Sequence, residues 1–405
     1  MDLNYRWKSA NGLMRRQQVI EALINGEADW QRHLIGMNGN DITNGRDLRG
    51  MDLSGLDLKK ANLEKTHLEG ANLSASDLSG VSLKYSFLRE TNLTGVNLQK
   101  ADLTGSDLQA AQLADALLME VMAKGSRFSY ADLTHANLSK SCISGADFRN
   151  ATLNGAIMDE VRADFASLSH TSAIGLHATG SAFNKTSWYK SRLNQSDLSS
   201  SALVESDLSL CSCIQTCFAH VDMSRARFKD VCLEDADLKH ISAEDSTFAN
   251  CTISGADFSH ANLTHCNFNQ SLAHSPARFE SITAPRFFAI EARLARCHFG
   301  GADLSESVFC EADLSECCFS DANLSEANLQ KSKMRSAHLE RVQFSKANLG
   351  GASLCDAHLD GADLRHLLLT PSIIHGSHMS GTKLSPDARE IIENSSISGD
   401  PVFEE

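Results

Sequence analysis

Four residues near the middle of the chain have the side chains of a metal site. Cys211, Cys213, Cys217 and His220 carry thiol and imidazole groups, which are ordinary ligands of Zn²⁺. Their spacing matches no standard zinc pattern. The sequence therefore predicts that these cysteines pack in the interior, and that the chain binds no metal ion and no cofactor.

A second candidate is a set of three histidines at equal spacing. His220, His240 and His260 are separated by twenty residues each. A column of imidazoles could sense pH or hold a metal, because closely spaced rings resist simultaneous protonation. A plain surface stack is the simpler interpretation, and both stay open at this point.

The chain contains none of the short motifs that mark common catalytic sites. A Gly-rich phosphate loop, a G-x-S-x-G elbow and an H-E-x-x-H helix are all missing from the sequence. We therefore expect that the protein is not an enzyme.

The elements that must position these residues follow a period of five. From Leu48 to Leu118 a leucine falls at every fifth residue, with a mostly small residue two places before it and usually Asp or Asn one place before it. On an α-helix, leucines at every fifth residue would spiral around the surface, and on a straight strand they would alternate between its two faces. All leucines can point inward only if the backbone turns a corner after each unit. Four corners close a coil of about twenty residues, with the next coil roughly 4.8 Å higher.

The repeats resemble those of the pentapeptide repeat proteins. The resemblance is carried by A-D-L-T-G at 101–105, A-D-L at 131–133 and A-N-L-S-E at 322–326. It implies an all-β fold, a right-handed quadrilateral β-helix. Some members of that family resemble duplex DNA in width and charge and bind type II topoisomerases, so the resemblance also implies DNA gyrase as a candidate partner.

The repeat divides the chain into five segments. Residues 1–45 do not repeat, and Leu13, Val19, Ile20, Leu23 and Ile24 predict an amphipathic helix that caps the first coil. Residues 46–268 form a first solenoid block and residues 294–384 a second. Between them, residues 269–293 contain two prolines and shift the inward position by one residue, which predicts an inserted residue, a bulge or a short loop. Residues 385–405 predict a short capping helix followed by an acidic tail.

Some inward positions are occupied by small residues. Ala123, Ala163 and Ala243 share one side of the solenoid, and we expect either that neighbours such as Met122 and Phe165 fill the space beside them or that this wall bends inward. The motif is weakest from residue 157 to residue 189. Trp188 and Tyr189 lie there and form a candidate partner surface.

Composition excludes several classes of protein. The net charge is −14, of which residues 131–268 supply −6 and residues 385–405 supply −5, so the chain is not a basic nucleic-acid binder. We find no secretory leader at the start and no segment long enough to span a membrane. Many of the twelve cysteines replace alanine at small inward positions, which favours a reducing, cytoplasmic location.

The first interpretation of function is a non-catalytic protein-interaction scaffold built on a rigid β-helix, with a partner of unknown identity. The alternative is a DNA mimic that binds gyrase and modulates or protects it. On that alternative Asp197, Asp237 and Asp257 share one column and imitate a row of phosphates. A delivered effector is a further alternative, and the oligomeric state, including a homodimer, stays open.

Overall fold

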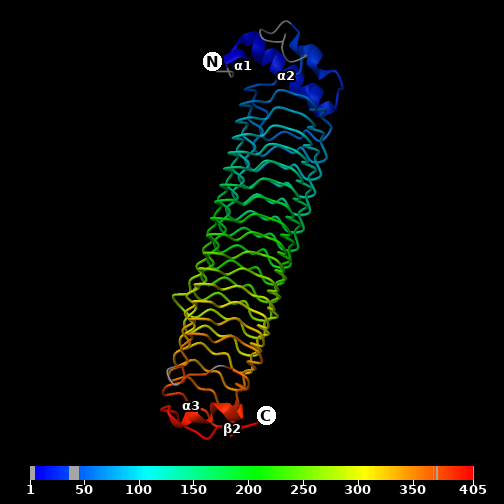
Figure 1. The fold of residues 1–405 in the computed structure, drawn as a ribbon. Coiled ribbons are helices and arrows are strands. Elements are labelled where there is room, and N and C mark those ends of the chain that lie inside the picture. The colour runs from blue at the N-terminus through cyan, green and yellow to red at the C-terminus, as the bar shows by residue number, and fades with distance from the viewer. Residues whose placement is uncertain (1–4, 36–44, 368, 371–372, 405) are drawn as a thin grey trace. The chain divides into compact units, whose positions relative to one another are not determined.

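The computed structural model describes residues 5–35, 45–367, 369–370 and 373–404. The chain forms two compact units, Met1–Ala202 and Leu203–Glu405. Their division lies inside the predicted first solenoid block, and not at residues 269–293. Both units are built from the same kind of coil (Figure 1).

Parallel pairing at twenty-residue spacing defines the coil. In the first unit Asp52 pairs with Asn72, and Asn72 pairs with Asn92. In the second unit Asp237 pairs with Asp257 in the same way. Successive pairing residues are five apart and are separated by two-residue turns, so each coil has four sides. The structure is therefore a four-sided β-helix, as the period of five predicts.

Each corner places one residue in the left-handed backbone region. Glycine adopts this region without a steric penalty, and Gly55 does so with φ 67°. Many corners carry a larger residue there, such as Tyr85 and His240, both with φ 56°. The strain at these corners is tolerated because the core and the inter-coil hydrogen bonds hold the backbone in place.

The large residues of the repeat form the core of each unit. Leu103 and Leu133 in the first unit, and Phe258 and Leu324 in the second, are fully buried, and Leu349 is 3% exposed. This confirms that the fifth-residue positions point inward. Burying a side chain of this size contributes about 1.5–3 kcal/mol.

Polar residues also occupy small inward positions, where backbone carbonyls accept hydrogen bonds from their hydroxyl or thiol groups. The hydroxyl of Ser126 donates to the carbonyl of Leu103, 2.6 Å away. The thiols of Cys266 and Cys317 lie 2.9 Å from the carbonyls of Ala243 and Leu294. Serine and cysteine can therefore replace alanine at such positions with their polar group paired, although the buried hydroxyl of Ser332 has no hydrogen-bond partner among the described residues.

Stacked phenylalanines dominate the core of the second unit. The rings of Phe258, Phe279, Phe299 and Phe319 lie one above another, with centroids 4.9, 4.7 and 4.8 Å apart. The spacing of the rings is the spacing of the coils, so each ring packs against its neighbours in the coils before and after it.

The expected filling of the alanine positions is wrong. Met122 is 49% exposed and Phe165 is 66% exposed, so neither enters the core. Instead, Phe183 is fully buried at the inward position one coil beyond Ala163. A large ring thus lies in the core one coil away from Ala163, whereas Met122 and Phe165 stay outside it.

The register shift at the prolines is a single inserted residue. Thr252 pairs with Leu272 at twenty residues, whereas Asp257 pairs with Arg278 at twenty-one. Pairing returns to twenty residues from Arg278 to His298. The extra residue thus lies at the corner between 272 and 278, and the coils continue through the rest of residues 269–293.

Three helical elements precede the first coil: α1 (Tyr5–Lys8), α2 (Ala10–Asn25) and η1 (Trp30–Leu34) (Figure 1). Ser9 caps α2 by accepting a hydrogen bond from the backbone of Gly12. Val19 and Leu23 are buried as expected. Leu13 and Ile24 are 52% and 39% exposed, so the buried stripe of α2 is narrower than its sequence predicts.

The second unit ends in β1 (Lys383–Leu384), η3 (Pro386–Ala388), α3 (Arg389–Glu393) and β2 (Val402–Phe403). β2 pairs in parallel with β1, and His378 pairs with Ser398. Residues of the predicted acidic tail, up to Glu404, therefore add to the last coil. Within the described residues, no helix has the length and apolar character needed to cross a bilayer.

Candidate partner surfaces

The three equally spaced histidines form a stacked column on the second unit. The ring of His240 lies 4.8 Å from that of His220 and 5.1 Å from that of His260, nearly parallel to both. All three residues are exposed corner residues.

The structure brings together two of the three aspartates of the expected acidic row. Asp237 and Asp257 pair across adjacent coils, whereas Asp197 belongs to the first unit, opposite His177. Lys239 lies between the two carboxylates, 3.4 Å from Asp237 and 3.5 Å from Asp257. Burial would raise the pKa of Asp257, but a hydrogen bond from Ser259 and the charge of Lys239 lower it. This part of the surface is therefore an ion-paired cluster and not an uncompensated row of charge.

Trp188 does not belong to the surface. It is fully buried at an inward position, where its ring makes an edge contact with Phe183 at 5.3 Å. The assignment of Trp188 to a partner surface is wrong, because the period of five already directs residue 188 inward. Tyr189 is half-buried, and the ring of His170 meets it edge-on at 5.9 Å.

The cysteine group is split between the core and the surface. Cys211 and Cys213 are buried at inward positions, whereas Cys217 is half-buried on an outer side. Burial raises the pKa of the Cys213 thiol well above its ordinary value and that of Cys251 to about 12. Thiols of this kind are poor nucleophiles. In the part of the chain that the structure describes, no three His, Cys, Asp or Glu residues are placed to hold a metal ion.

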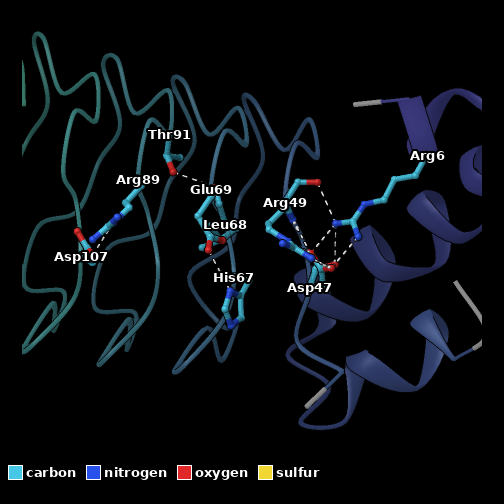
Figure 2. A network of polar contacts seen from close by, with 9 residues as sticks. All are labelled: Arg6, Asp47, Arg49, His67, Leu68, Glu69, Arg89, Thr91 and Asp107. Carbon is cyan, nitrogen blue, oxygen red and sulfur yellow. Dashed lines mark hydrogen bonds and ion pairs between the residues drawn. The ribbon is translucent and has the colours of Figure 1, made fainter. Parts of the chain in front are cut away.

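A buried ion pair joins the N-terminal helices to the first coil (Figure 2). Arg6 donates to both oxygens of Asp47, at 2.8 and 2.6 Å, and Arg49 donates to the same carboxylate at 3.0 and 2.8 Å. The Asp47 side chain is fully buried. Burial alone would raise its pKa, but the hydrogen bonds from Arg49 and Arg6 and the charge of Arg6 hold the pKa well below its usual range.

Side chains of the same segment satisfy carbonyls at the outer edge of the first coil. The Trp7 indole donates to the carbonyl of Arg49 and the Trp30 indole to that of Asn62, both at 2.9 Å. Arg16 donates to the carbonyl of Asp52 at 2.9 Å. Carbonyls at equivalent positions in later coils accept hydrogen bonds from the preceding coil, as that of Asn72 does from Leu53. Sequence reasoning missed these contacts, because a tryptophan or arginine in a helix does not reveal which distant carbonyl it reaches.

A scan against known protein families matches most of the repeat region. Residues 44–75, 71–109, 116–155, 206–242 and 232–270 match pentapeptide repeats, and residues 292–385 match a pentapeptide repeat region. The chain belongs to the pentapeptide repeat family. No curated protein matches this pentapeptide repeat protein.

Several solved structures are similar to this pentapeptide repeat protein. HetL, involved in heterocyst differentiation regulation in the cyanobacterium Nostoc sp. strain PCC 7120, is 19% identical over 71% of this chain and 89% of its own, with a TM-score of 0.18. Full-length QnrB1, a plasmid-mediated fluoroquinolone resistance protein, is 17% identical over 54% and 90%, with a TM-score of 0.20. A thylakoid lumen protein of Arabidopsis thaliana is 27% identical over 31% and 74%, with a TM-score of 0.14. At these TM-scores the similarities add no argument about function.

This pentapeptide repeat protein has a second histidine column that the sequence reading missed. His338 and His358 stack at 4.9 Å, and His378 follows at 6.4 Å with a tilted ring. Glu340 and Asp360 accept from the imidazoles of His338 and His378, at 3.1 and 2.5 Å. The spacing of twenty residues between these histidines could have revealed the column. It was missed because the three residues follow the register shift and lie on a side of the coil, whereas the first column lies at a corner.

Proposed function

We propose that this chain is a non-catalytic scaffold that binds a protein partner through its outer side-chain columns. The observation that supports this is the regular alignment of outward side chains in successive coils, about 5 Å apart, as in the two histidine columns. A packed core and inter-coil hydrogen bonds hold these side chains in place. A preorganised surface of this kind loses little entropy on binding, which favours affinity.

The experiment is a capture assay with reconstitution. The immobilised full-length protein and an unrelated β-helix of similar charge are exposed to the same extract, and a protein retained only by the former is then purified and titrated. We expect saturable binding that is lost when one outward column is altered, for example by His220→Ala, His240→Ala and His260→Ala together or by the corresponding changes in the second column. If no protein is retained above the control, the scaffold proposal is wrong.

The alternative function, a DNA mimic that binds gyrase, is favoured by one observation. Residues 203–405 hold 29 Asp and Glu against 16 Lys and Arg, a net charge of −13. Lys239 weakens the proposal by neutralising part of the expected acidic row. A supercoiling assay at low salt tests it. A mimic should inhibit or protect gyrase, and the variant with Asp197→Lys, Asp237→Lys and Asp257→Lys should lose the effect. No effect of the wild-type protein at any concentration would contradict the mimic.

We also propose that residues 5–34 cap the first coil. The support is the set of hydrogen bonds from Arg6, Trp7, Arg16 and Trp30 to the carbonyls of that coil. An exposed coil edge would pair with other chains. Deletion of residues 1–40 should therefore produce concentration-dependent association in analytical ultracentrifugation, and a deletion variant that stays monomeric would exclude a capping role.

A cytoplasmic location is likewise a proposal. All twelve cysteines are free thiols, and five of them are buried at the small inward positions where other repeats carry alanine: Cys211, Cys251, Cys266, Cys297 and Cys317. Such a composition suits a reducing compartment. Fractionation of cells that express the chain, followed by thiol labelling of the recovered protein, would test it, and recovery from an oxidising compartment would contradict it.

A further inference from the structure

One stretch of this acidic protein lacks acidic residues altogether. Between Asp164 and Asp197 the sequence contains Lys185, Lys190 and Arg192 but no Asp or Glu. No other acid-free stretch of the chain is as long. Lys190 and Arg192 take part in no ion pair among the described residues, so the charge of these two side chains is not neutralised by a carboxylate there.

Two cations of this stretch lie beside aromatic rings at adjacent corners, and one of these rings is exposed while the other is half-buried. At one corner Phe165 is 66% exposed, and the Lys185 ammonium lies 5.7 Å from the centre of its ring. At the next corner the Lys190 ammonium lies 5.3 Å from the ring of Tyr189, which His170 meets edge-on. Attraction between a cation and the face of an aromatic ring holds such pairs in place.

Small hydroxyl residues form the side of the coil between these two corners. Ser167 and Ser187 pair across adjacent coils on this side. The hydroxyl of Ser187 lies 2.8 Å from that of Ser169, which begins the second corner. We call Phe165, Ser167, His170, Lys185, Ser187, Tyr189 and Lys190 the basic–aromatic face. Its serine hydroxyls lie on one side of the coil, which we call the floor. The corner at each end of this side, which we call an edge, carries one cation and one aromatic ring.

Phe165 is an unusual residue for its corner. Its φ of 62° lies in the left-handed region, where a bulky residue is disfavoured, and its ring is outside the core. The equivalent corners of the three preceding coils carry Gly105, Gly125 and Gly145, which adopt the same conformation without strain. A strained and exposed phenylalanine is better explained by contact with another molecule than by folding.

We propose that the basic–aromatic face binds an acidic peptide segment of a partner protein. Carboxylates of the segment pair with Lys185 and Lys190 at the two edges, and its apolar groups cover Phe165 and Tyr189. The serine hydroxyls of the floor are available to backbone groups of the peptide. This inference rests on the proposed scaffold function and names the chemistry of one partner surface.

A nucleic acid fits the face less well than a peptide does. The two lysines are five residues apart in one coil, so the cationic edges span a single side and do not form a stripe that follows a phosphate backbone. The net charge of −14 also repels a long polyanion more strongly than it repels a short segment. Charge complementarity therefore favours a short acidic segment with apolar residues.

The test uses the full-length protein and two labelled probes. The first is a decapeptide of glutamates interrupted by two phenylalanines, and the second is a ten-nucleotide DNA strand. Fluorescence anisotropy at low salt should show saturable binding of the peptide. The combined change Lys185→Glu and Lys190→Glu should weaken binding about tenfold or more, because two attractive contacts become repulsive. Phe165→Ala should weaken it about threefold.

The matched control reverses two other exposed lysines of the same unit, Lys65→Glu and Lys124→Glu, which form no ion pair among the described residues. It leaves the net charge equal to that of the double variant and should bind the peptide nearly as well as the wild type. Thermal unfolding followed by circular dichroism establishes that the variants are folded. If the double variant does not fold, Lys190→Gln serves as a milder change.

Four outcomes would overturn the proposal: equal loss in the control, no peptide binding by the wild type, tighter binding of the DNA strand, and equal retention of a captured protein by the double variant and the wild type. The result is separable from the scaffold proposal. If the face binds the peptide but the capture assay retains no protein, the scaffold function fails while the face stands. If a protein is retained equally by the Lys185→Glu, Lys190→Glu variant and the wild type, that partner uses another surface and the present inference fails.

Discussion

The two units are built from the same kind of coil but differ in net charge. Residues 1–202 hold 22 Asp and Glu against 21 Lys and Arg, a net charge of −1, whereas residues 203–405 carry −13. Their cores differ as well, since buried leucine is the rule in the first unit and stacked phenylalanine is frequent in the second. Outward side chains do not pack in the core, so the same coil can carry a nearly neutral or an acidic surface. The comparison shows that the charge of the outward positions can change from coil to coil while the coil itself is kept.

The largest expected effect concerns the two cores. Phe279→Ala removes a ring that stacks on Phe258 and Phe299, and we expect it to destabilise the second unit by about 3–5 kcal/mol. Leu103→Ala should destabilise the first unit by about 2–5 kcal/mol. Because coils interact mainly with their neighbours, each loss should be local.

Tryptophan fluorescence separates the two effects. All three tryptophans lie in residues 1–202, so their signal reports the first unit, and hydrogen exchange of peptides from 203–405 reports the second. If Phe279→Ala lowered the unfolding midpoint of both units equally, the assumption of local coil energetics would be wrong.

The second expected effect concerns the buried ion pair at the start of the first unit. Asp47→Asn breaks the carboxylate contacts with Arg6 and Arg49, and we expect a loss of about 3 kcal/mol at neutral pH. Asp52→Asn is the control, because its carboxylate is 54% exposed and should cost no more than about 1 kcal/mol. Denaturant unfolding followed by tryptophan fluorescence measures both, and equal losses would contradict the importance of burial.

The same pair should make the first unit sensitive to acid. The pKa of Asp47 is lower in the folded state than in the unfolded chain, so the folded state binds this proton less readily. Its stabilisation is complete above the unfolded pKa of about 4 and is lost as the pH falls through the lower folded value. Asp47→Asn should flatten this part of the pH profile. An unchanged slope below pH 4 would show that other carboxylates control acid unfolding.

A smaller effect distinguishes two corner glycines, one in each unit. Gly125 has φ 62° and open space where a Cβ would lie, so Gly125→Ala should cost about 1 kcal/mol from backbone strain alone. At Gly255, with φ 70°, a Cβ would collide with the Asp235 carboxylate. Gly255→Ala should therefore lower the free energy of unfolding by more than Gly125→Ala does, unless the Asp235 side chain rotates away. In the double variant Gly255→Ala, Asp235→Ala the loss should fall to that of Gly125→Ala. Thermal unfolding curves decide between these outcomes.

The smallest effect is expected at the exposed ion pairs of the second unit. Arg341 contacts Asp321 at 2.6 Å and Lys346 contacts Glu326 at 2.9 Å, each across one coil. Exposed pairs of this kind contribute little, since water and salt screen them. Arg341→Gln and Lys346→Gln together should leave the unfolding midpoint of the second unit unchanged within experimental scatter. A clear decrease that disappears at high salt would show that these pairs act as a network.

Much of the fold could be predicted because the period of five acts locally. The inward positions, including Leu103, Phe258 and Leu324, follow from counting residues, since each five-residue side turns at its own corner. The same counting places Trp188 inward, and its assignment to the surface neglected that rule. The one-residue insertion near Pro276 was visible for the same reason, although its confinement to one corner was not.

The tertiary structure decided which outward side chains are neighbours. Lys239 reaches carboxylates in its own coil and the next, and Arg6 reaches Asp47 across forty-one positions of the chain. Such partners depend on side-chain rotamers and on neighbours about twenty or more residues away, which leave no local pattern in the sequence. By itself, therefore, the sequence determined the coil, the core positions and the uneven charge. Only the tertiary structure decided which charges are paired, which apolar residues of α2 are buried, and that Phe165 and Tyr189 flank one basic face.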